Sequence, residues 1–132
     1  MAKRASYDLS QFVIACNIGN KSALVLDEAM KTAKLDFNLY TQDKVLSFIG
    51  NGGLESPKFA NTERWIKNPD PKNPIMVDSY NFFSGLDYGY LAFLFQLKFK
   101  KWFIKSFKKN DKPDPRNLPF AEPLRAIFGG KK

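Results

Sequence analysis

The densest group of residues able to do chemistry lies towards the C-terminal end of the chain, where lysines alternate with aromatic side chains. Lysines neutralise phosphates and release counterions, and aromatic rings stack on unpaired bases. This pattern predicts a surface for single-stranded nucleic acid. An open alternative is that the rings belong to the core and the lysines are only solvated. The run comprises Lys98, Phe99, Lys100, Lys101, Trp102, Phe103, Lys105, Phe107, Lys108, Lys109 and Lys112.

The overall charge favours a polyanionic partner. The chain has 21 Lys and Arg against 13 Asp and Glu, a formal net charge of +8. Such a field attracts nucleic acid first, an anionic membrane second and an acidic protein third. We therefore expect RNA as the main partner. A basic protein without any nucleic-acid function remains the alternative.

The residue types that the chain lacks exclude several classes of enzyme. There is no histidine, and Cys16 is the single cysteine. The usual acid–base catalyst, most zinc sites and a disulfide framework are therefore absent. The carboxylates are scattered, so a divalent-metal nuclease is not expected. We predict no metal, no cofactor and a buried, inert Cys16.

RNA can nevertheless be cleaved without histidine or metal, because its own 2′-hydroxyl group is the nucleophile. The protein has to position the strand, neutralise the scissile phosphate and move protons. Lys, Arg, Tyr and Glu side chains can do this. The composition thus allows the reaction without predicting it.

The elements that must position these residues begin with three predicted helices. Apolar spacing indicates a first helix between Tyr7 and Asn20 and a second from about Ser22 to Lys34. A third helix begins at Thr41, a good N-cap. It ends at Gly50–Gly53, which as a phosphate-binding loop would be a weak candidate.

Strands are predicted in the second half of the chain. Prolines make Leu54–Pro74 irregular. Three strands follow at Ile75–Phe83, Tyr88–Phe99 and Trp102–Lys108, and the middle strand is apolar enough to be covered on both faces. Consecutive antiparallel strands form a curved sheet, and the helices must cover one face of it.

These elements predict an α+β fold, with a helical front half packed on a curved, mainly antiparallel sheet. Residues 1–110 form one domain, and residues 111–132 form an extended, proline-rich C-terminal tail. No segment reaches the ~20 apolar residues of a membrane helix, so no membrane partner is expected. The lack of disulfides favours a reducing compartment, and we expect a soluble, cytoplasmic protein.

Several short motifs occur in the order of a known toxin family. Over about residues 3 to 109 the chain resembles the motility quorum-sensing regulator (MqsR) family of type II toxins, which look like RelE-type mRNA interferases. The resemblance implies a RelE-like fold, metal-independent endoribonuclease cleavage of mRNA and neutralisation by a cognate antitoxin protein. The motifs are Lys3-Arg4, Tyr7-Asp8-Leu9-Ser10, Lys21-Ser22-Ala23-Leu24, Leu35-Asp36-Phe37, Val77-Asp78-Ser79-Tyr80 and Ile104-Lys105-Ser106-Phe107-Lys108.

The resemblance also implies a set of site residues. Lys58, Tyr80 and Lys108 are expected around the scissile phosphate. Val77 and Phe93 stand where the family has a glutamine and a tyrosine, and the substitutes on offer are Tyr88, Tyr90, Gln96 and Arg64. Further nucleic-acid contacts are expected from Arg64, Lys98, Lys100, Lys101, Lys105 and Lys109.

Two other functions remain open. The chain could be an RNA- or ribosome-binding protein that keeps the sheet without the chemistry, as the two departures from the family pattern suggest. It could instead be a protein-interaction module that uses the basic face, with the tail as a ligand or as a self-inhibiting strap.

Overall fold

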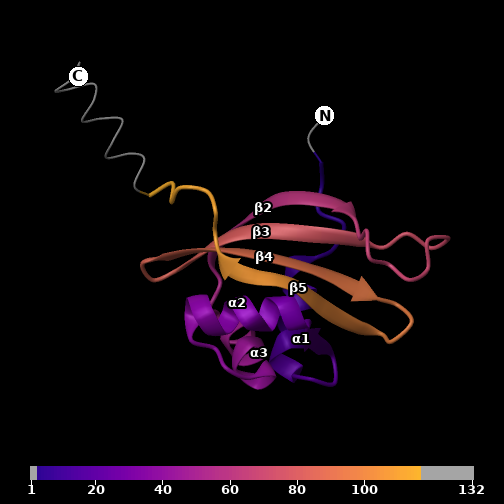
Figure 1. Cartoon of the computed structure of the whole chain (residues 1–132), viewed down its shortest axis with the longest axis horizontal. Helices are drawn as coiled ribbons and strands as arrows, with labels where there is room; N and C mark the ends of the chain where they lie inside the picture. The colour runs from indigo at the N-terminus through magenta and orange to yellow at the C-terminus, as the bar shows by residue number, and fades with distance from the viewer. Residues whose placement is uncertain (1–2, 117–132) are drawn as a thin grey trace, which may run out of the picture.

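The computed structural model describes residues 3–116, in which one layer of helices packs against one sheet (Figure 1). The fold is therefore α+β. The helices are α1 (Leu9–Ile18), α2 (Asp27–Phe37) and α3 (Gln42–Gly50). The strands are β1 (Ala23–Val25), β2 (Glu55–Arg64), β3 (Met76–Ser84), β4 (Asp87–Gln96) and β5 (Lys101–Lys109).

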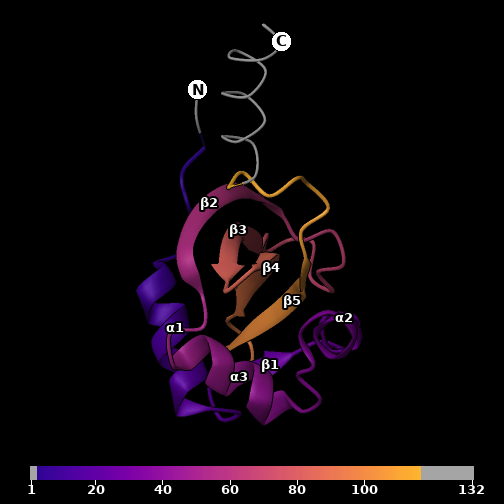
Figure 2. The ribbon, with the colours of Figure 1, turned by 90° about the vertical axis from the view of Figure 1, so that its left-hand side faces the viewer.

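The sheet is mixed, open and curved. Its strand order is β1-β5-β4-β3-β2, and β2 to β5 are antiparallel neighbours as predicted for the last three of them. The short β1 adds a parallel edge beside β5. Figure 2 shows β2 arching over the rest of the sheet at the other edge.

The main core lies between the helices and the sheet. Phe12 of α1 stacks on Phe93 of β4 with ring centroids 3.9 Å apart. Both rings are fully buried, together with Phe82 and Phe107 from the neighbouring strands. Gly89 keeps this layer tight, since a Cβ there would lie 2.2 Å from Phe82 Cζ.

A smaller apolar cluster lies on the other face of the sheet. It contains Ala92 and Leu94 of β4 and Phe103 of β5, and Trp65 and Ile75 pack against it. The middle of β4 is thus covered on both faces, as predicted. Trp65 meets the Phe103 ring edge-on at 6.4 Å.

Local capping positions the first and third helices where the sequence predicts them. Asp8 accepts a hydrogen bond from the Ser10 N–H at 2.9 Å, and Thr41 Oγ1 accepts one from the Lys44 N–H at 3.1 Å. Each bond satisfies an N–H group that the first helical turn leaves without a partner.

The predicted second helix is wrong at its start. Ala23–Val25 forms β1, in parallel register with Trp102–Ile104, and α2 begins only at Asp27. The Gln42 side-chain amide bonds both the N–H and the carbonyl of Val25, at 2.8 and 2.6 Å, and so covers this sheet edge. Pairing with a distant strand outweighs the weak local preference for helix.

The prediction that Leu54–Pro74 is irregular is also wrong in its first half, which forms β2. β2 is an edge strand, so the missing N–H of Pro57 does not interrupt the sheet. Two register irregularities near this proline and near Ala60 bend the strand. The second half, from Trp65 to Pro74, is a loop, and there the prediction is confirmed.

The last hairpin is shorter than predicted. β4 ends at Gln96 rather than Phe99, and Leu97–Lys100 makes the turn, with Lys100 at a φ of 54°. A left-handed conformation is uncommon for a lysine, and here the tight turn between the two strands imposes it. The lysine expected as a turn residue at position 101 instead begins β5.

The first part of the predicted tail folds back over the β3–β4 hairpin. The Arg116 guanidinium lies 4.1 Å from the centroid of the Phe83 ring and donates to the carbonyl groups of Gly85 and Asp87. Asp114 holds the guanidinium by an ion pair of 2.8 Å. The remainder of the tail, 117–132, lies outside the described residues.

Cys16 is buried as predicted, and its burial should make the stability of the protein depend on pH in the alkaline range. Burial raises the pKa of the Cys16 thiol to about 12, whereas the unfolded chain ionises at roughly pH 8.5. The folded state thus holds its proton more tightly, so the contribution to stability is complete below roughly pH 8.5 and falls by about 1.4 kcal/mol per pH unit above it.

Cys16→Ala therefore isolates this contribution. Between pH 8 and pH 10 we expect the wild-type protein to lose about 2 kcal/mol more unfolding free energy than the variant. Urea titrations under a reductant at both pH values measure it. Equal losses in the two proteins would show that the thiol does not titrate in this way.

Candidate nucleic-acid interface

The face of the sheet that points away from the helices carries a row of polar side chains across four strands. Lys58 of β2 pairs in register with Asn81 of β3, Asn81 with Tyr90 of β4, and Tyr90 with Lys108 of β5. Successive side chains alternate between the two faces of a sheet. Phe107, next to Lys108, belongs to the core on the helix side. We call Lys58, Asn81, Tyr90 and Lys108 the polar row.

A cavity of about 360 Å³ lies against the polar row, lined by Asn81, Tyr90, Lys108 and Asn110 among others. Asn110 orients Asn81, because its Nδ2 donates to Asn81 Oδ1 at 2.6 Å and to the Gly89 carbonyl at 3.2 Å. The volume is at the low end of the roughly 300–1,000 Å³ typical of ligand pockets. It suits a phosphate with part of its nucleotide.

Lys108 is the cation of this cavity. Its Nζ lies 5.7 Å from the centroid of the Tyr90 ring and 3.1 Å from Asp111 Oδ2. The Asp111 side chain is 86% exposed, and an ion pair at such a site contributes only about 0–1 kcal/mol. A phosphate can therefore replace Asp111 at little cost.

Lys58 occupies the other end of the polar row. It is exposed on the edge strand. Three strand spacings separate it from Lys108, which is about 14 Å between Cα atoms in a flat sheet. Lys58 and Lys108 can thus extend their side chains from the two ends of the row towards one RNA strand that lies over Asn81 and Tyr90.

The structure does not place Tyr80 beside Lys108, where it was expected. It is only 7% exposed and stacks on Phe93 at 5.9 Å in the helix-side core. Burial, with a smaller effect from the Asp78 charge, raises the pKa of Tyr80. Its ring cannot reach a ligand on the opposite face, so Tyr80 is removed from the candidate site.

Asp78, the partner of Tyr80 in the same motif, is also structural. Its side chain is completely buried and accepts hydrogen bonds from the N–H groups of Ser6 and Tyr7, at 3.0 and 2.9 Å. The carboxylate thereby ties the segment before α1 to the centre of the sheet.

The predicted run of lysines is divided between the two ends of β5. Lys98, Lys100 and Lys101 lie at the β4–β5 turn. Seven residues of strand separate Lys101 from Lys108, a distance of about 23 Å. The structure therefore brings these turn lysines together with each other but not with the polar row.

The remaining predicted contacts also lie apart. Arg64 ends β2 opposite Met76, far from Lys108 along the sheet. Lys105 is skipped in the register between β4 and β5, as the extra residue of a bulge. Lys109 pairs with Gly89, and its Nζ lies 3.9 Å from Asp87 Oδ1.

Sequence reasoning missed Asn81 and Asn110. Alternation along the predicted strand at 75–83 separates residue 81 from the apolar residues 80 and 82, which was a usable signal. Asn110 lies beyond the last strand, and only the tertiary structure returns it to β3. Tyr90, named as one possible substitute, is the tyrosine that faces the cavity.

Within residues 3–116, no group of three or more His, Cys, Asp or Glu side chains is placed to hold a metal ion. None of the helices described for this part of the chain has the length and apolar character needed to cross a membrane.

A scan of protein-family models found no match to the chain, and neither curated proteins nor solved structures yielded a similar one. The resemblance to the MqsR family stays a prediction.

Proposed function

We propose that this chain is the toxin of a type II toxin–antitoxin pair and cleaves mRNA without a metal ion. The observation that carries the proposal is the polar row, in which Lys58, Asn81, Tyr90 and Lys108 are register neighbours and the last three line a cavity. Two lysines, an amide and a phenol on one sheet face offer the phosphate contacts and the stacking surface that a single RNA strand requires.

The proposed reaction assigns a role to each of these groups. The 2′-oxygen attacks the adjacent phosphorus, the bond from phosphorus to the 5′-oxygen breaks, and a 2′,3′-cyclic phosphate forms. The neutral amine form of Lys58 accepts the proton of the 2′-hydroxyl. Lys108 neutralises the charge on the phosphate, and the Tyr90 phenol supplies a proton to the leaving 5′-oxygen. The expelled strand ends in a 5′-hydroxyl.

The test is cleavage of a long, unstructured RNA by purified protein in excess EDTA. Fragments with 2′,3′-cyclic phosphate and 5′-hydroxyl ends support the proposal. Binding that weakens with salt but leaves the RNA intact would favour a non-catalytic RNA- or ribosome-binding protein. If the protein neither binds nor cleaves RNA, the basic face would instead be a surface for a protein partner.

The antitoxin expected for such a toxin is an acidic segment that covers the polar row. Opposite charges speed association and select the partner. A partly disordered segment can wrap a large surface as it folds. Asp111, already on Lys108, shows the type of contact that such a segment would make.

Asp111→Ala is expected to raise affinity for RNA by a few fold. The substitution removes a carboxylate 3.1 Å from Lys108 Nζ. The RNA phosphate then binds the ammonium group without first displacing Asp111. Fluorescence anisotropy with an uncleavable, 2′-deoxy oligonucleotide at low salt measures the change. Asp43→Ala, an exposed carboxylate in the first turn of α3, is a charge-matched control. Equal gains in both variants would show only an effect of net charge.

A further inference from the structure

A second, larger cavity lies where β3 and β4 separate. The register between these strands ends at Asp78 and Phe93, although β3 begins at Met76 and β4 continues to Gln96. Tyr7 enters this gap and donates its hydroxyl proton to the Met76 carbonyl at 2.8 Å. The cavity has a volume of about 690 Å³, within the roughly 300–1,000 Å³ range of small-ligand sites.

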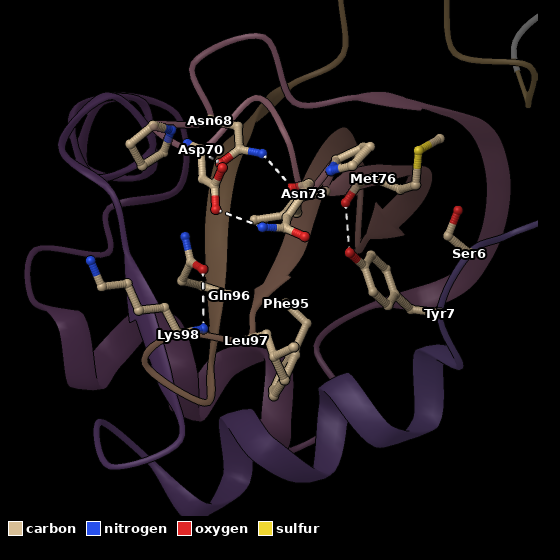
Figure 3. Close-up of a pocket in the computed structure, with 13 residues that line it drawn as sticks. Ser6, Tyr7, Asn68, Asp70, Asn73, Met76, Phe95, Gln96, Leu97 and Lys98 are labelled. Carbon is tan, nitrogen blue, oxygen red and sulfur yellow. Dashed lines mark hydrogen bonds between the residues drawn. The ribbon is translucent and has the colours of Figure 1, made fainter.

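The loop between β2 and β3 forms a roof over this cavity and carries its own hydrogen bonds (Figure 3). Asn68 Nδ2 donates to the Asn73 carbonyl at 2.9 Å, and Asn73 Nδ2 donates to Asp70 Oδ2 at 2.7 Å. Asn68 Oδ1 accepts from the Asp70 N–H at 3.0 Å. These bonds within the loop keep the cavity open beneath it.

The walls combine apolar surface with one buried amide. Tyr7, Met76, Phe95 and Leu97 supply aromatic and aliphatic area. Gln96 is only 6% exposed. Its Oε1 accepts the Lys98 N–H at 3.2 Å, and Figure 3 shows its amide nitrogen facing the loop. Among residues 3–116, no hydrogen bond uses that nitrogen as a donor.

A buried amide donor without an acceptor is destabilising, and a ligand with an acceptor edge would supply the missing partner. Apolar walls around such a donor fit a flat heterocycle whose edge carries carbonyl or ring-nitrogen acceptors. Lys98 lines the same cavity and lies on the same side as Gln96 in Figure 3, where it can meet a phosphate. A purely aliphatic ligand would leave the Gln96 amide unsatisfied.

We infer that this cavity binds a nucleobase, with Gln96 donating to its edge and Lys98 contacting its phosphate. This inference rests on the proposed function, because we take the base to belong to the RNA strand that is cut on the polar row. Six residues of β4 separate Tyr90 from Gln96, about 20 Å, which corresponds to about six nucleotides at the stacked rise of 3.4 Å.

The same chemistry could be supplied by a free ribonucleotide, and the experiment separates the two sources. Full-length, ¹⁵N-labelled protein is titrated with each of the four ribonucleoside 5′-monophosphates and, separately, with an RNA octamer bearing 2′-deoxy linkages. The expected result is saturable shifts of the Gln96 side-chain amide and of the 68–75 loop. Shifts with the octamer but not with the free nucleotides would show that the cavity binds a base of an RNA strand.

Variants make the inference quantitative. Gln96→Leu should weaken binding at this cavity about tenfold, the value of one hydrogen bond near 1.4 kcal/mol. Lys98→Ala, a surface change that keeps the fold, should weaken it several fold and reduce its salt dependence. Lys31→Ala on the exposed face of α2 is the matched control.

The outcomes distinguish this inference from the proposed function. Nucleotide binding at Gln96 by a protein that cuts no RNA would support the cavity and reject the nuclease. Cleavage of RNA with no shift at Gln96 or in the loop, and with Lys98→Ala unchanged in affinity, would reject the cavity and keep the nuclease.

Discussion

Replacing Lys108 by alanine is expected to slow RNA cleavage by about 10²- to 10³-fold, the usual cost of losing one group that stabilises developing charge in a transition state. Lys108 lines the cavity of the polar row, and its Nζ lies 5.7 Å from the centroid of the Tyr90 ring. Its side chain is 35% exposed, so truncation should leave the core intact. Single-turnover rates with excess protein, measured in EDTA, give the effect on the chemical step.

Companion variants separate the roles within the polar row. Lys108→Arg keeps the charge in a different geometry and should retain part of the activity. Tyr90→Phe keeps a ring for stacking but removes the phenol, so it should lower the rate more than the affinity. Lys31→Ala should match the wild type. A Lys108→Ala rate within twofold of wild type would remove Lys108 from the site.

Replacing Asp78 by alanine is expected to lower the free energy of unfolding by about 3 kcal/mol, because two backbone donors lose a charged acceptor. The carboxylate is fully buried and holds the N–H groups of Ser6 and Tyr7. Its loss should release the segment before α1 and disturb Tyr7, which bridges to the Met76 carbonyl. Urea unfolding midpoints at an unchanged slope measure the loss.

Asp78→Asn tests the reason for that loss. Asparagine has the same shape and keeps one acceptor, but it places an NH₂ group against the second donor, so an intermediate loss is expected. Glu63→Ala, an exposed carboxylate on β2, should change stability by no more than about 0.5 kcal/mol. If Asp78→Ala fell in that same range, the buried carboxylate would contribute no net stability.

Both predictions concern residues from the motifs that carry the family resemblance. Tyr80 and Lys108 were expected together in the site, and Asp78 stands two residues before Tyr80 in the same motif, yet side-chain alternation sends residues 78 and 80 towards the helices. The polar row keeps Lys58 and Lys108 and uses Tyr90 and Asn81 in place of Tyr80. Which face of β3 meets the helices is a question of register, and a shift of one residue reverses it.

The sequence by itself determined the features that depend on neighbouring residues. The cap at Thr41, the irregular segment that ends at Pro74 and the apolar run of β4 each carry a local signal, because a cap, a loop or a buried strand is specified within a few residues. The buried thiol of Cys16 and the α+β class followed from similar patterns.

Only the tertiary structure decided the rest. Ala23–Val25 becomes a strand because β5 lies beside it, and Glu55–Arg64 becomes one because β3 does. The lysines close together in the sequence are spread along about 23 Å of β5. Asn110 reaches Asn81 across 29 positions of chain. Contacts between distant segments depend on how the whole chain closes, and no local pattern specifies that closure.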